Sequence, residues 1–145
     1  MHKPHVTVAA VVRCNDQYLF VIEKDKLTNQ RVVNQPAGHL EQNETLIEAC
    51  QRELFEETGL RLTPDSFIGT YRYTAPTGTD YLRFCFYFQV DNLDQPLIPQ
   101  DKDIEQALWL TKAQLGQYTL RSPLVMQCIN DSEQRPTIGL EYICG

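Results

Sequence analysis

The chain has 145 residues, a length that suits one domain with its own hydrophobic core and leaves no room for a second. Hydrophobic residues make up 42% of the chain and charged residues 22%, as in an ordinary globular protein, and the formal net charge is −6. This acidic balance, without a Lys/Arg cluster, argues against a general nucleic-acid-binding protein, and no apolar stretch approaches a membrane-spanning length. We therefore expect a single domain over residues 1–145, with no nucleic-acid or membrane partner, as a monomer or a homodimer.

The cysteines and the N-terminus indicate a cytoplasmic protein. Five cysteines are odd in number, are scattered along the chain and form no C-x-x-C pair, so we expect reduced thiols rather than disulfides or a zinc site. The apolar run 6–12 is short, stops at Arg13 and lacks a cleavage-site pattern, so a signal peptide is not expected.

The first third of the chain predicts three strands. Residues 6–13 form an apolar run bounded by Pro4 and an Asn-Asp turn, which is typical of a buried strand. Residues 17–23 should pair with this run as a hairpin. A polar loop then leads to a short strand, residues 31–34, which feeds a Pro-Ala-Gly turn within residues 36–40.

A helix follows this turn. Thr45 with Glu48 three residues later is typical of a capping box, in which each residue satisfies a free backbone N–H group at the start of the helix. Leu46, Ile47, Cys50 and Leu54 recur at helical spacing, and Gly59 is a natural stop.

The second half predicts two aromatic strands, a loop and two helices. Residues 67–74 and 81–90 are rich in β-formers and flank a Pro-Gly turn, and the second of them should be central in the sheet. Residues 91–103, with two prolines and four aspartates, indicate a loop before a strand at 107–110. We expect a short capped helix from Thr111 and a last helix starting near Pro123; residues 135–145 have no clear pattern. Strands around one helix, followed by more helices, indicate an α+β fold with a mixed sheet.

Three acids share one face of the first helix. Glu53, Glu56 and Glu57 are spaced i, i+3, i+4, which places them within an arc of roughly 100°. Three like charges on one face repel, and Arg52 is the only cation on this helix that could offset them. A carboxylate cluster beside an apolar stripe suits a hard divalent cation, although most acidic helix faces are simply solvated.

The order of residues around this helix resembles the signature of the Nudix hydrolases, G-x5-E-x7-R-E-U-x-E-E-x-G-U with U apolar. The specified positions are filled by Gly38, Glu44, Arg52, Glu53, Leu54, Glu56, Glu57, Gly59 and Leu60. Further segments resemble the NudJ phosphatase branch of that family: the opening Lys3 to Ala9, Asn34 to Glu41, Leu82-Arg83-Phe84 and Leu120 to Val125. The resemblance implies a Nudix α/β/α sandwich, with the motif helix on one face of a mixed sheet and the closing helix on the other.

The resemblance also implies a metal site. Glu53, Glu56 and Glu57 would be Mg²⁺ ligands together with the Gly38 carbonyl, with Mn²⁺ as a possible substitute ion. Arg52 would hold a motif carboxylate in its ligating conformation. Glu44 would orient the loop or the helix start, or would only be an acid stabilised by the helix dipole.

In this family the base that removes a proton from the attacking water is either a motif glutamate or an acid in a distant loop. Glu53 and Glu57 are the motif candidates. Asp101, Asp103 and Glu105 are the loop candidates, with Asp103 slightly ahead of the others; the alternative is a solvated acidic loop.

Substrate phosphates need cations, and the candidates are Arg13, Arg31, Arg72 and Arg83. Because Arg83 stands in an aromatic strand, its charge should be paired with a phosphate or an acid. Tyr73 and its tyrosine neighbours, with the Asn34 and Gln35 amides, could stack on and hydrogen-bond a heteroaromatic ring, although each is more often a core or rim residue.

The resemblance implies a Mg²⁺-dependent, NudJ-like enzyme that releases phosphate from nucleoside tri- and diphosphates and from small pyrophosphates such as hydroxymethylpyrimidine pyrophosphate. One alternative is a MutT-like enzyme that hydrolyses 8-oxo-dGTP to release pyrophosphate. The other is a Nudix domain that senses a nucleotide without cleaving it, but loss of motif glutamates would be its sign, and none is lost.

Overall fold

The computed structural model describes residues 1–145 and contains seven strands and two α-helices. In chain order they are β1 (His5–Cys14), β2 (Gln17–Lys24), β3 (Arg31–Asn34), β4 (Ala37–His39), α1 (Leu46–Thr58), β5 (Ser66–Thr74), β6 (Asp80–Gln89), β7 (Ile104–Thr111) and α2 (Leu124–Gln134). Single 3-10 turns at Gln114–Gln117 and Leu140–Tyr142 complete the chain.

All seven strands belong to one mixed sheet, with the order β3-β2-β1-β6-β5. β1 and β6 are parallel, and the other pairs are antiparallel. As expected, β6 is an interior strand. β4 pairs with β1. β7 pairs with the edge of β2 that is opposite to β1.

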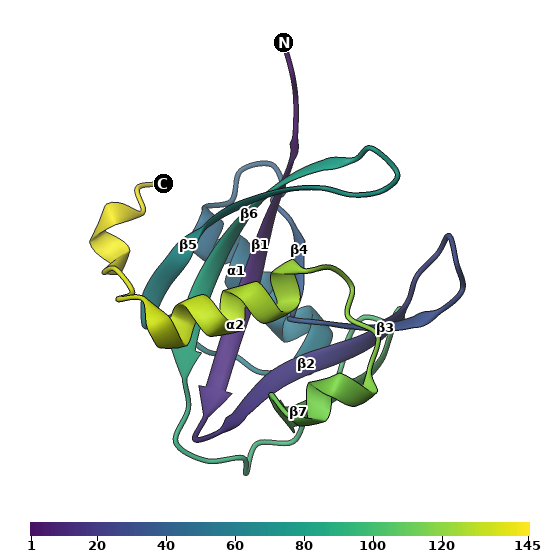
Figure 1. The fold of residues 1–145 in the computed structure, drawn as a ribbon. Coiled ribbons are helices and arrows are strands. Elements are labelled where there is room, and N and C mark those ends of the chain that lie inside the picture. Colours follow the sequence, from purple (N-terminus) through teal and green to yellow (C-terminus); the bar gives the residue numbers. More distant parts are fainter.

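β1 and β2 pair only next to the turn that connects them. Arg13 and Cys14 pair with Tyr18 and Gln17, and beyond this point β1 continues beside β4 while β2 continues beside β3 and β7. Figure 1 shows the two strands leaving their common turn in diverging directions. The segment from β3 to β4 crosses from one half of the sheet to the other.

The two helices lie on opposite faces of the sheet, which confirms the α/β/α sandwich expected from the sequence (Figure 1). Since side chains alternate along a strand, β1 supplies both cores. Val8, Ala10 and Val12 pack with α1, and Ala9 and Val11 pack with α2. Neither helix combines the length and the apolarity that a membrane span requires.

The structure changes three details of the predicted elements. The residues expected to form a turn before α1 include β4, whose Gly38 pairs with Val8. The short helix expected from Thr111 is a single 3-10 turn, although its expected cap is present: Thr111 Oγ1 accepts from the Gln114 N–H at 3.3 Å, and Gln114 Oε1 accepts from the Thr111 N–H at 2.8 Å. The C-terminal segment, for which no element is predicted, returns to the sheet through a bridge between Ile138 and Phe67.

Candidate functional site

β4 and α1 bring the motif glycine against a motif acid. An added Cβ at Gly38 would overlap the carboxylate of Glu53, so this carboxylate lies directly on the Gly38 peptide. Only glycine leaves room for such an approach. The Glu53 oxygens and the Gly38 backbone therefore lie side by side, as the predicted ligand set requires.

Glu57 is the most buried of the motif acids. It is 6% exposed, and its Oε1 accepts a hydrogen bond from the Ala37 backbone N–H at 3.0 Å. Burial raises the pKa of Glu57 to about 9, and the nearby charges of Glu23, Glu53 and Asp101 act in the same direction. A buried carboxyl group among like charges has no cation to balance it within the protein.

Arg52 holds the other acids of the motif. Its guanidinium donates to both carboxylate oxygens of Glu44, at 3.0 and 2.8 Å, to Glu53 at 2.8 Å and to Glu56 at 3.3 Å. It also donates to the His39 carbonyl at 3.0 Å, which ties the end of β4 to α1. Glu44 in turn accepts from the Glu41 N–H at 2.7 Å, so Glu44 orients the loop before the helix.

This donor set fits a hard divalent cation in its chemistry: several carboxylates, one of them buried without a counter-charge, beside a backbone carbonyl. Burial also raises the pKa of Glu53, against the opposite effect of Arg52. The carboxylates do not converge on one point, and no three His, Cys, Asp or Glu side chains form a closed ligand group. Glu53 and Glu56 turn to Arg52, and Glu57 turns to the Ala37 N–H.

Among the loop acids, the structure brings Asp101 rather than Asp103 to the site. The N–H groups of Gln100 and Asp101 both donate to the Glu56 carbonyl at 2.8 Å, which fixes the loop on the last turn of α1. The side chain of Asp103 is exposed, and Glu105 pairs with Arg31 at 2.6 Å. The distance to the following strand favours Asp103 over Asp101, but this distance does not reveal which acid turns inward.

A further acid, Glu23 of β2, joins this group although the sequence analysis did not single it out. Its carboxylate accepts a hydrogen bond from Arg121 at 3.2 Å. Burial raises the pKa of Glu23, and Asp101 adds to this effect. The available signal was an acid at the end of an otherwise apolar strand.

Arg83 is buried as expected, and its partners within the chain are neutral groups. It is 6% exposed and donates to Gln35 Oε1 and Asn34 Oδ1, each at 3.2 Å, and to Cys128 Sγ at 3.8 Å. None of these is an acid, which is one of the two partners expected from the sequence; the other is a substrate phosphate. Neutral amides take this role because the segment between β3 and β4 passes next to β6, a proximity that the sequence does not show.

The structure separates three other predicted substrate residues from the acids. Arg13 lies at the turn of β1 and β2, five residues beyond Val8; its guanidinium lies 5.3 Å from the Tyr18 ring centroid and donates to the Asn15 carbonyl. Tyr73 of β5 packs against the core beneath α2, on the face opposite α1. Arg72 pairs with Asp80 at the far end of the β5–β6 hairpin.

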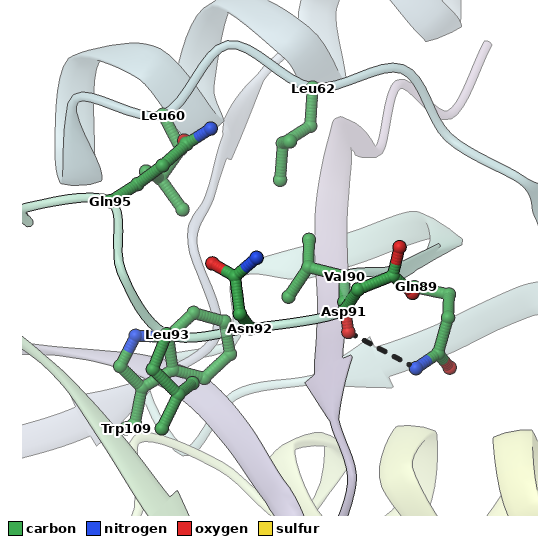
Figure 2. A pocket seen from close by; sticks show the side chains of 9 residues that line it. All are labelled: Leu60, Leu62, Gln89, Val90, Asp91, Asn92, Leu93, Gln95 and Trp109. Atoms are coloured by element: carbon green, nitrogen blue, oxygen red, sulfur yellow. Dashed lines mark hydrogen bonds between the residues drawn. The ribbon is translucent and has the colours of Figure 1, made fainter.

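A pocket of about 260 Å³ lies apart from the acids, next to the end of α1. Figure 2 shows Leu60 and Leu62 on one side of it and Trp109 on the other, with Asn92 between them. The Trp109 Nε1–H is buried and has no hydrogen-bond partner. No predicted site residue lines this pocket.

Comparisons with known proteins agree with this geometry. Residues 3–127 match the NUDIX domain family. Over 144 residues the chain is 41% identical to phosphatase NudJ of Escherichia coli K12, with 99% of the chain and 92% of the relative covered. The Shigella flexneri protein of the same name gives the same figures.

Solved structures agree as well. A NUDIX hydrolase from Nitrosomonas europaea superposes with a TM-score of 0.87 at 40% identity, over 99% of this chain and 97% of that one. The NUDIX domain of Shewanella oneidensis NrtR, solved with ADP ribose, has a TM-score of 0.77 at 18% identity, over 93% and 90%. A bifunctional NMN adenylyltransferase/ADP ribose pyrophosphatase from Francisella tularensis, solved with AMP and a Mn ion, has a TM-score of 0.70 at 24% identity, over 92% and 42%. The last two likenesses concern the fold alone.

Proposed function

The chain belongs to the Nudix hydrolase family and is a hydrolase of phosphoric anhydride bonds, and from this premise we propose that it is a Mg²⁺-dependent phosphatase of nucleotides and small pyrophosphates. The observation that carries the proposal is the buried, uncompensated Glu57 beside Gly38 and Glu53. A cation at this place would balance the acids, and it would also attract the phosphates of a substrate.

In this proposal the residues of the chain divide the work. Glu53, Glu56, Glu57 and the Gly38 carbonyl hold the cation, and Arg52 keeps the carboxylates of Glu53 and Glu56 in place. Mg²⁺, with Mn²⁺ as a substitute, supplies positive charge for the phosphate oxygens and lowers the pKa of a water molecule when it is bound.

A base must then take the proton of the attacking water, and we assign this role to Asp101. Its Oδ1 accepts from the Asp103 N–H at 2.9 Å, which fixes the side chain and leaves Oδ2 without a hydrogen bond from the protein. Its charge raises the pKa of both Glu23 and Glu57, so Asp101 lies near these two acids. Asp103 then orients Asp101 through its backbone.

The substrate class follows from the similarity to phosphatase NudJ over nearly the whole chain. We propose nucleoside tri- and diphosphates, and heteroaromatic pyrophosphates such as hydroxymethylpyrimidine pyrophosphate, with orthophosphate as a product. Asn34 and Arg83 then lie in the wall of the substrate site, where Arg83 supports Asn34 rather than contacting a phosphate itself, because it is 6% exposed.

The test is to quantify orthophosphate and pyrophosphate separately for this panel and for 8-oxo-dGTP, with and without Mg²⁺. We expect orthophosphate from several substrates and its loss in Glu57→Gln, while Glu141→Gln, an exposed acid near the C-terminus, behaves as wild type. Pyrophosphate from 8-oxo-dGTP alone would instead indicate a sanitising enzyme. Nucleotide binding without turnover would indicate a sensor domain.

A further inference from the structure

Arg121 faces the acid group from the segment that precedes α2. Its backbone N–H donates to the Val33 carbonyl at 2.8 Å, and the Val33 N–H donates to the Thr119 carbonyl at 2.9 Å. Leu120 forms a parallel bridge with Val33, so the segment continues the sheet beside β3. The backbone of Arg121 is therefore fixed, while its side chain remains 40% exposed.

Arg121 also has donors to spare, unlike Arg52, the arginine that holds the motif acids. One nitrogen bonds to Glu23 Oε1 at 3.2 Å, and no other bond from its side chain is present. By contrast, Arg52 donates to three carboxylates and a carbonyl. Arg31 also makes a single side-chain bond, but that bond goes to Glu105 rather than to Glu23. A guanidinium with free donors in an exposed position is suited to a phosphate, which it can bind with two parallel hydrogen bonds.

Glu23 is a partner that a substrate could replace. It is a half-buried acid among like charges, because Asp101 and Asp25 both raise its pKa. Arg121 is the only cation paired with it. A bound phosphate would compete with Glu23 for the guanidinium, and the exchange costs less once a cation lies among the acids and offsets the charge of Glu23.

We propose that Arg121 binds a phosphate group of the substrate and that Glu23 holds the guanidinium in position until the substrate arrives. The inference rests on the proposed phosphohydrolase function, because it assigns a second phosphate contact to the same site. It makes the binding of phosphate and of the divalent cation mutually supportive. It also gives a role to the Leu120–Val125 segment, which the proposed hydrolysis does not otherwise use.

The test measures binding of methylenediphosphonate, which has two phosphoryl groups but no anhydride bond to hydrolyse, by calorimetry with Mg²⁺. We expect Arg121→Ala to weaken binding roughly 10- to 100-fold, the usual effect of losing charge-assisted hydrogen bonds. Arg121→Lys keeps the charge without the fork and should fall between Arg121→Ala and wild type. Glu23→Gln should bind the probe more tightly than wild type, because the competing carboxylate is gone.

The proposal predicts weaker probe binding for Arg121→Ala and tighter probe binding for Glu23→Gln. If the two residues formed only a structural ion pair, both variants would weaken probe binding. A double variant, Glu23→Gln with Arg121→Ala, separates two effects of Glu23 on probe binding: competition for the Arg121 guanidinium, and repulsion of the probe by the Glu23 charge. We expect the gain from Glu23→Gln to vanish without Arg121; a gain that persists would overturn the proposal. Arg135→Ala, a half-exposed arginine paired at the other end of α2, serves as the matched control and should bind like wild type.

Turnover separates this inference from the proposed function. For a hydrolysed nucleotide, Arg121→Ala should raise KM more than it lowers kcat. If the wild-type protein turns over substrate and Arg121→Ala binds the probe as tightly as the wild-type protein does, the inference is overturned and the proposed function stands. If probe binding depends on Arg121 but no substrate is turned over, the proposed function is overturned and the phosphate contact of Arg121 stands.

Discussion

At the scale of single residues, the site depends on whether one residue leaves space for the side chain of another. An added Cβ at Gly38 would occupy the space of the Glu53 carboxylate. The backbone of Gly38 does not have a positive φ, so the reason for glycine here is space and not backbone conformation. Gly116, by contrast, has no atom within 4 Å of an added Cβ. The two positions therefore form a matched pair for the same substitution.

Gly38→Ala should displace the Glu53 carboxylate and thereby separate two of the proposed metal ligands. We expect turnover to fall by roughly 100-fold or more, because misplacing a catalytic group by about 1 Å costs this much. Gly116→Ala should leave turnover unchanged. Steady-state kinetics with circular dichroism as a check on folding measures both; a Gly38→Ala variant with normal kcat and KM would contradict the role of the contact.

The loop acids offer a second paired test. Asp101→Asn keeps the hydrogen bond from the Asp103 N–H but removes the proton acceptor, so kcat should fall by roughly 10²- to 10⁴-fold. Asp103→Asn changes an exposed side chain and leaves its backbone N–H in place, so kcat should stay close to that of wild type. Rapid-quench measurement of a single turnover gives the chemical step directly. The reverse order of effects would return the role of base to Asp103.

At the scale of elements, the motif helix is specified locally. Thr45 Oγ1 accepts from the Glu48 N–H at 3.1 Å and Glu48 Oε1 accepts from the Thr45 N–H at 2.9 Å, and Gly59 ends the helix in the left-handed conformation at φ 79°. These contacts lie within a few residues, so the sequence predicted them correctly. The strands other than β4 were also predictable from apolar runs and turns.

Thr45→Ala removes one half of the capping box. We expect a loss of about 1 kcal/mol in the free energy of unfolding, or about 2–4 °C in Tm for a domain of this size. Thr45→Ser keeps the hydroxyl and should lose much less. Thermal unfolding followed by circular dichroism compares the two; equal losses would mean that packing of the Thr45 methyl group, rather than the cap, carries the effect.

β4 marks where local prediction stops. Pro36 and Gly38 indicate a turn by composition, yet residues 37–39 pair with β1 because β2 has moved away from it. This pairing depends on the divergence of two strands, which is a property of the whole sheet. The amide partners of Arg83 depend on the same divergence, so no local pattern could reveal them.

At the scale of the molecule, one buried side chain links the α2 layer to the residues before the motif. Gln35 is 1% exposed; its Nε2 donates to the Val125 carbonyl at 2.7 Å, and its Oε1 accepts from Arg83 at 3.2 Å. The next residues lead into β4 and the Gly38 peptide. The motif helix and the acids were predictable from spacing, whereas this link between the two faces of the sheet was not.

Gln35→Ala should therefore affect stability and the site together. It leaves the Val125 carbonyl and the Arg83 guanidinium short of partners in a buried region, so we expect a loss of about 2–4 kcal/mol in the free energy of unfolding and about 5–15 °C in Tm. Gln42→Ala, at an exposed position before α1, is the control and should change Tm by less than about 1 °C. Since Gln35 also holds the chain that carries Gly38, the variant should bind Mg²⁺ more weakly even at temperatures where it is fully folded. Calorimetric titration with Mg²⁺ well below Tm measures this second effect, and a folded Gln35→Ala protein with wild-type affinity would mean that the two faces of the sheet are energetically independent.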